Sequence, residues 1–114
     1  MTQNSAKRQV LIFGPPDSQQ LMAQLALLSK ESAGLKERDV AVSAVTKNSS
    51  LYRQFGIATT VPFVILLVGK DGGEKYRSKE LTTAQQLFDL IDAMPMRMQE
   101  IRRDKKQPNK KGST

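Results

Sequence analysis

The sequence predicts a single α/β domain with a mixed four-stranded sheet and helices on both of its faces. Short apolar segments alternate with segments of helical periodicity, in the order β-α-β-α-β-β-α. Strands joined through a helix are expected to be parallel, and two strands joined by a tight turn antiparallel. We expect the domain to occupy residues 1–104, with a basic, disordered tail at residues 105–114, where apolar periodicity is lost.

Four segments have strand character. Val10–Phe13 is a short apolar run that ends at Gly14-Pro15-Pro16, which is typical of a buried strand with a parallel partner. Residues 40–45 are β-rich, and residues 63–68 are apolar throughout, which predicts a strand buried on both faces. Residues 74–78 follow a glycine-rich turn and carry alternating charge, which predicts an edge strand with one solvated face.

The first two helices are indicated by caps and stops. The first helix is expected to begin after Asp17 or Ser18, because the side-chain oxygen of either residue can accept from free backbone N–H groups. Gly34 is expected to end this helix. Asn48-Ser49-Ser50 precedes a brief helix, which Gly56 ends.

The last helical region is divided by a proline. Thr82 and Gln85 match a capping box, and Pro95 interrupts the following helix and can begin a second one over residues 96–103. Four apolar residues near this break are expected to pack against the sheet, with an adaptable binding face as the alternative. They are Met94, Met96, Met98 and Ile101.

Composition excludes much catalytic chemistry. The chain has no cysteine and no histidine, so it can form no disulfide, thiolate nucleophile or Ser-His-Asp triad. Ser18 therefore has no histidine to activate it as a nucleophile, and we expect it to cap a helix instead. The turn at residues 69–74 matches neither a calcium loop nor a P-loop. We expect no catalytic residue, metal or cofactor; an enzyme that uses only carboxylates, lysine or arginine is a third-ranked alternative.

Positive charge is concentrated at the C-terminus. The net charge is +7, and residues 97–114 carry seven basic and two acidic side chains. This region could contact a polyanion or nucleic acid, although it has no aromatic residue to stack on bases; a merely solvated tail is the alternative. The candidate polyanion-binding residues are Arg102, Arg103, Lys105, Lys106, Lys110 and Lys111.

One stretch resembles thioredoxins. Phe55-Gly56-Ile57, then Val61-Pro62, an apolar strand and the turn at residues 69–74 are similar to the segment around the thioredoxin cis-proline. The resemblance implies a cis peptide bond between Val61 and Pro62. It also places the family's Cys-x-x-Cys pair at Gly14-Pro15-Pro16-Asp17-Ser18, where this chain has no thiol.

A second resemblance spans most of the chain. Its most specific part is the run from Ile91 to Arg97, supported by residues 25–28, 34–39 and 68–73. These segments are similar to a domain of unknown function that occurs in bacterial proteins, often exported ones, and in sushi-repeat-containing extracellular proteins of animals. That family is regarded as thioredoxin- or peroxiredoxin-like with degenerate redox positions. Residues 1–9 depart from its pattern.

The predicted function is that of a non-catalytic binding or structural module without thiol redox activity, with polyanion binding through the tail as the alternative. The resemblance implies that an extended protein segment docks by strand addition beside the residue before the proline. A small anion at the helix N-terminus is the rival ligand. The start of the first helix near Asp17 and the backbone of Val61 are expected to meet there, so the candidate site residues are Pro16, Asp17, Ser18, Val61 and Pro62.

The sequence contains no membrane-spanning run and no apolar leader at its start. We therefore expect a cytoplasmic protein as the chain is given, or an exported one whose leader is absent from this sequence.

Overall fold

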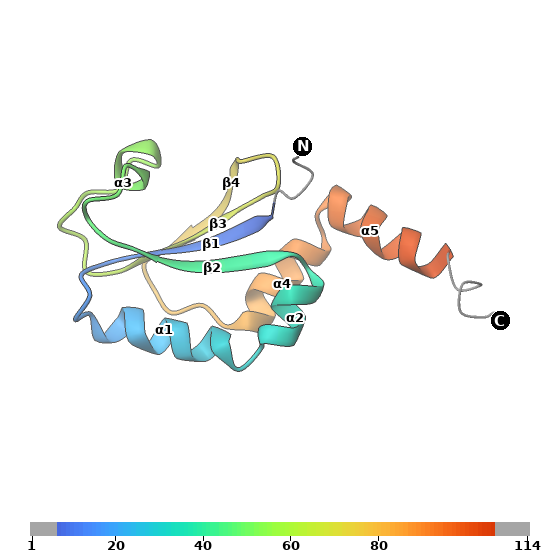
Figure 1. Cartoon of the computed structure of the whole chain (residues 1–114), viewed down its shortest axis with the longest axis horizontal. Coiled ribbons are helices and arrows are strands. Elements are labelled where there is room, and N and C mark those ends of the chain that lie inside the picture. Colours follow the sequence, from blue (N-terminus) through green and yellow to red (C-terminus); the bar gives the residue numbers. More distant parts are fainter. Residues whose placement is uncertain (1–6, 107–114) are drawn as a thin grey trace.

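A computed structural model describes the backbone of residues 7–106 and the side chains of residues 7–102 (Figure 1). The elements in chain order are β1 (Arg8–Phe13), α1 (Gln19–Ser29), α2 (Ser32–Glu37), β2 (Val40–Val45), α3 (Leu51–Gln54), β3 (Val64–Val68), β4 (Glu74–Ser78), α4 (Ala84–Asp92) and α5 (Pro95–Lys106). No helix in this part of the chain combines the length and apolarity needed to cross a membrane.

The four strands form one mixed sheet in the order β2-β1-β3-β4. β1 pairs with β2 in parallel and with β3 antiparallel, and β3 pairs with β4 antiparallel through the tight turn. Every residue of β3 is buried, since β3 lies inside the sheet and is covered on both faces. The mixed four-stranded sheet predicted from the sequence is confirmed. The expectation that strands joined through a helix are parallel holds for β1 and β2 but is wrong for β2 and β3, which run in opposite directions on the two sides of β1.

Helices cover the two faces unequally (Figure 1). α1, α2 and α4 pack on one face, where they form the larger core with β1 and β3. α3 lies on the other face, where Tyr52 packs edge-on against Phe13 with 5.0 Å between ring centroids. α5 begins at Pro95, as predicted, and extends away from the sheet.

Two predicted helix boundaries are wrong. Gly34 does not stop a helix but lies inside α2. It is needed there for close packing, because a Cβ atom would come within 2.7 Å of the Phe88 ring. The capping box is formed by Thr83 and Gln86, one residue later than predicted. The reason is that the backbone of Thr82 is buried and bonded to a side chain of α1.

The C-terminal predictions need correction as well. Met96 and Met98 are 47% and 46% exposed, because α5 turns them away from the sheet, so the expected core packing is wrong for these two residues. α5 continues through Lys106 and therefore crosses the expected boundary between residues 104 and 105. The rest of the expected tail, residues 107–114, lies outside the described residues.

The expected cis peptide bond is also wrong: all peptide bonds among residues 7–106 are trans. The chain instead reverses in a turn just before Pro62, where the N–H of Val61 donates to the carbonyl of Ala58 at 3.2 Å. Residues 58–61 make up this turn.

Candidate functional site

The two segments that carry the five predicted binding residues lie next to each other. Ser18 is the N-cap of α1 and accepts from the N–H of Leu21 at 3.1 Å. The same hydroxyl donates to the carbonyl of Pro62 at 3.1 Å. Gly14 allows this approach, since a Cβ atom there would lie 2.7 Å from the Pro62 oxygen. The predicted meeting of the helix start with the segment before β3 is therefore confirmed.

The polar groups at this place are used within the domain. The Val61 N–H, which the resemblance assigned to a peptide ligand, bonds Ala58, and the Ser18 hydroxyl is engaged both as donor and as acceptor. Pro16, Asp17 and Pro62 are exposed. Binding at this place stays a prediction, and its expected backbone donor is already occupied.

The sheet offers free backbone groups at its β2 edge instead. The N–H of Arg8 donates to the carbonyl of Asp39 at 2.9 Å, and Arg8 lies opposite Val40 in the parallel register. In a parallel pair, successive residues of a strand point their backbone groups alternately toward and away from the partner. The odd-numbered residues of β2 therefore bond β1. The backbone groups that point outward belong to Val40, Val42 and Ala44.

β2 has β1 as its single neighbour in the sheet formed by residues 7–106. We call the side of β2 that faces away from β1 the open edge. The strand reads Val-Ala-Val-Ser-Ala-Val, without charge or proline, and its six pairs with β1 run without a bulge. Natural sheets usually protect such an edge with charges, proline or a bulge.

The opposite edge of the sheet has that protection. β4 carries Glu74, Lys75 and Arg77, and the β3–β4 register shifts between Leu67 and Val68. Arg77 is held in place by bonds of 2.8 Å to Glu74 and 2.7 Å to the carbonyl of Phe55. Of the two edges, β2 is therefore the one suited to receive another strand.

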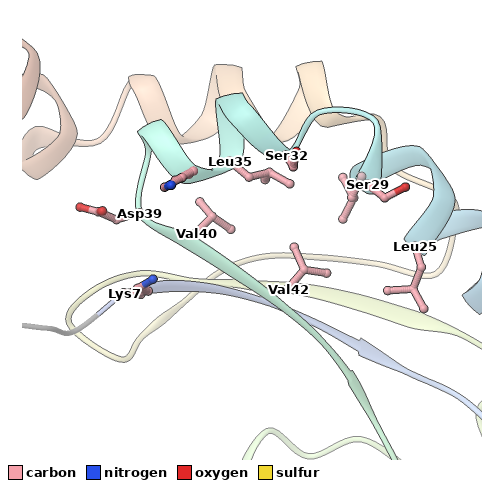
Figure 2. A pocket seen from close by; sticks show the side chains of 10 residues that line it. Lys7, Leu25, Ser29, Ser32, Leu35, Asp39, Val40 and Val42 are labelled. Carbon is pink, nitrogen blue, oxygen red and sulfur yellow. The ribbon is translucent and has the colours of Figure 1, made fainter.

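A groove of about 660 Å³ accompanies the open edge. Figure 2 shows Val40 and Val42 of β2 on one side of it and Leu25, Ser29, Ser32 and Leu35 of the α1–α2 region on the other. Its apolar lining consists of Leu25, Leu28, Leu35, Val40 and Val42. We call this space the β2 groove.

Charged residues border the β2 groove near the start of β2. Lys7, Lys36 and Asp39 line it, and all three are exposed. Asp39 is already paired, because Lys70 donates to its carboxylate at 2.9 Å. Neither Lys7 nor Lys36 lies within 4.0 Å of a carboxylate among the described side chains. The border of the groove therefore presents unbalanced positive charge.

A network of ion pairs fixes α5 against the body next to this region. Arg8, whose side chain is 1% exposed, bonds both carboxylate oxygens of Glu100 at 3.3 Å, and Lys70 bonds Glu100 at 2.8 Å. Burial alone would raise the pKa of Glu100, but the hydrogen bonds from Lys70 and Arg8 outweigh it and lower that pKa. Burial likewise acts to lower the pKa of Lys70, and its bonds to Glu100 and Asp39 raise it overall.

A second group of pairs joins α2 to α4 and α5. Arg38 bonds Asp92 through two nitrogens at 3.0 Å and lies 4.0 Å from the Phe88 ring centroid. Arg97 bonds Asp92 at 3.2 Å and Glu37 at 3.0 Å. The hydrogen bonds from Arg38 and Arg97 lower the pKa of Asp92. These contacts connect two of the segments, residues 34–39 and 91–97, that carried the sequence resemblance.

The remaining candidates add little chemistry. Among the described residues, no three acidic, histidine or cysteine side chains gather in a way that could hold a metal ion. Of the candidate polyanion-binding residues, Arg102 is exposed on α5. The other five side chains lie outside the described ones. They are Arg103, Lys105, Lys106, Lys110 and Lys111.

Sequence reasoning missed the β2 groove, although one signal was present. The strand at residues 40–45 carries no charge, whereas the strand at residues 74–78 carries three. That contrast indicates which edge is unprotected once both are known to be edges.

Comparison with known proteins places this architecture in a family. Residues 2–100 match the domain of unknown function DUF4174. The chain belongs to this family. The sushi repeat-containing protein SRPX of Rattus norvegicus and that of Mus musculus are each 30% identical to it over 114 residues. The match covers 83% of this chain and 25% of each relative, so the chain spans about a quarter of the length of these proteins.

Solved structures show the same fold. A malarial protein superposes with a TM-score of 0.59 at 23% identity, over 75% of this chain and 94% of its own. A reduced 2-Cys peroxiredoxin of Plasmodium vivax gives 0.59 at 13% identity, over 87% and 81%. A disulphide isomerase of Xylella fastidiosa Temecula1 gives 0.52 at 23% identity, over 77% and 78%. The fold is thioredoxin-like, as the sequence predicted.

Proposed function

We propose that this domain is a non-catalytic protein-binding module that receives an extended segment as an added strand along the open edge of β2. The observation that carries the proposal is the difference between the two sheet edges: β2 is uncharged and regular, whereas β4 is charged and bulged. An unprotected edge is a template for strand addition.

The geometry of the edge supports a strand in this position. The outward backbone groups of Val40, Val42 and Ala44 supply alternating donors and acceptors, and an added strand would lie about 4.8 Å away. Its side chains would alternate between the two faces of the sheet. Those on the face of Val40 and Val42 would enter the β2 groove, so apolar side chains there would be removed from water.

Composition supports the absence of catalysis. Without cysteine or histidine the chain has neither a thiol nor an imidazole base, and the Ser18 hydroxyl is occupied by two hydrogen bonds within the domain. The expected partner class, an extended protein segment, is unchanged from the sequence prediction. The position differs, since the Val61 N–H is engaged and the β2 edge is free within the described part of the chain.

A proline scan of β2 tests the proposal. Val42→Pro removes an outward N–H that bonds nothing in β1, whereas Ser43→Pro removes one that β1 uses. Decapeptides selected from a random displayed library against the full chain serve as the probe. We expect Val42→Pro to stay folded and to weaken their binding about tenfold or more. Val42→Thr, which keeps the N–H and nearly the same shape, is the matched control and should lose far less affinity than Val42→Pro does.

Amide hydrogen exchange locates the bound peptide. Binding should slow exchange at Val40, Val42 and Ala44, whose amides are free, and leave Ala41 and Ser43 little changed. Peptides that bind Val42→Pro as tightly as the parent would contradict the proposal. So would protection confined to the start of α1 and Val61, which would favour the site predicted from the sequence. Failure to select any binding peptide would contradict both positions.

A further inference from the structure

We infer that the segment received by β2 carries two apolar side chains, spaced two residues apart, followed on one side by acidic residues that meet Lys7 and Lys36. This inference rests on the proposed strand addition and specifies the chemistry of the partner. It comes from two independent features of the β2 groove: the register of its apolar lining and the uneven charge of its border.

The apolar requirement follows from the period of a strand. Val40 and Val42 lie two residues apart on β2 and point into the groove toward Leu25 and Leu35 (Figure 2). Residues of an added strand that lie opposite these two valines point to the same face. Two alternate apolar side chains of the partner would therefore fill the groove. The residue between them would lie on the other face, beside Ala41, and can be polar.

The acidic requirement follows from where the lysines lie. Lys7 directly precedes β1, and since Arg8 is opposite Val40, Lys7 lies at the start of the parallel β2 strand. Lys36, near the end of α2 and shortly before Val40 in the chain, also lines the groove. Asp39 does not neutralise them, because it is bonded to Lys70 at 2.9 Å. Carboxylates just beyond the Val40 end of the added strand would balance this charge.

The direction of the added strand decides where the acidic residues stand in the partner sequence. In a parallel arrangement they precede the apolar pair, and in an antiparallel arrangement they follow it. Both directions put the carboxylates at the same place on this domain.

Charge also argues against a second copy of the chain as the occupant. A second β2 strand would be uncharged, with the same two lysines beside it and the same Asp39 held by Lys70. Such a pair brings no available carboxylate to the groove. The complementary occupant is therefore a different segment, acidic at one end.

Charge reversal tests the inference on the full chain. Peptides selected from the random library are resynthesised with each glutamate or aspartate replaced by its amide, and both forms are titrated by fluorescence anisotropy. We expect the acidic forms to bind about tenfold more tightly at low salt, with the difference shrinking as salt rises. Lys7→Glu combined with Lys36→Glu should abolish that difference. Lys79→Glu changes an exposed lysine outside the groove lining and is the control for charge reversal elsewhere on the surface.

The outcomes separate the inference from the proposed function. Selected peptides that depend on the β2 edge but show no acidic preference would overturn the inference and leave strand addition in place. Binding that is unaffected by Val42→Pro would overturn both. Concentration-dependent dimerisation that Val42→Pro abolishes would overturn the inference, because the occupant would then be a second copy. An acidic preference that the double reversal removes, and the Lys79 control keeps, would support it.

Discussion

A buried glutamine joins α1 to the segment before α4, and changing its chemistry without changing its shape should couple stability to pH. Gln24 has no exposed surface, and its amide bonds the backbone of Thr82 twice. Its nitrogen donates to the Thr82 carbonyl and its oxygen accepts from the Thr82 N–H, both at 2.8 Å. Gln24→Glu keeps the acceptor but puts a second carboxyl oxygen against the carbonyl. Only a protonated carboxyl group can again donate a hydrogen bond to the Thr82 carbonyl.

The size of the effect follows from burial. Buried carboxyl groups have pKa values up to about 8–9, against about 4.3 for an exposed glutamate. A rise of about 3 units corresponds to about 4 kcal/mol, since each unit is worth about 1.4 kcal/mol. The folded protein then holds the proton more tightly than the unfolded chain does. The loss of stability is therefore complete above the raised pKa and vanishes below about pH 4.3.

Urea unfolding followed by circular dichroism at pH 4 and pH 8 measures this difference. The quantity to compare at each pH is the free energy of unfolding of the variant relative to the parent. We expect a loss of about 4 kcal/mol at pH 8 and under about 1 kcal/mol at pH 4. Gln20→Glu, at an exposed position of the same helix, should change stability by less than about 0.5 kcal/mol at either pH. An equal loss at both pH values would refute the reasoning.

Three further substitutions test the packing of the domain by the same unfolding assay. Gly34→Ala should destabilise by about 1–3 kcal/mol although alanine favours helices, because its Cβ would lie 2.7 Å from the Phe88 ring; a gain in stability would contradict this. Tyr52→Phe should cost about 1–3 kcal/mol, since it removes the hydroxyl that accepts from the buried Gly14 N–H at 3.1 Å; an unchanged midpoint would count against that bond. Glu100→Gln should cost about 2 kcal/mol at pH 7 and progressively less as the pH falls below about 4.5. The pKa of Glu100 is lowered in the fold, so its contribution is present above about pH 4.5 and lost as pH falls through the lowered pKa; a loss that does not depend on pH would be inconsistent with this.

The pattern of apolar residues was enough to predict most of the fold. The run at residues 63–68 predicted a strand covered on both faces, and β3 is such a strand. The charged segment at residues 74–78 predicted an edge strand, and β4 lies at an edge. These predictions succeed because strand burial depends on a period of two residues and on composition, both of which are local. Likewise, the sequence alone was enough to exclude thiol chemistry, because it contains no cysteine.

The candidate site was predicted less well, for physical reasons that particular residues illustrate. The meeting of Ser18 with Pro62 followed from the family resemblance, but the bond from Val61 to Ala58 that occupies the expected donor depends on the local turn. The groove beside β2 requires α1, α2 and β2 to be placed in three dimensions before it exists.

The sequence by itself determined the order of the four strands and of most helices, the charge of each segment and the chemistry the chain lacks, but it did not separate α2 from α1. Tertiary structure alone decided which edge is open, which lysines border the groove and how the buried charges pair. Arg8 and Glu100 are separated by 92 positions in the chain and meet at 3.3 Å. No local period encodes such a contact, because it arises when the start of β1 and the first turns of α5 pack at the same end of the sheet. Long-range packing therefore fixes the polar contacts, while the local pattern fixes the strands and helices that bring them together.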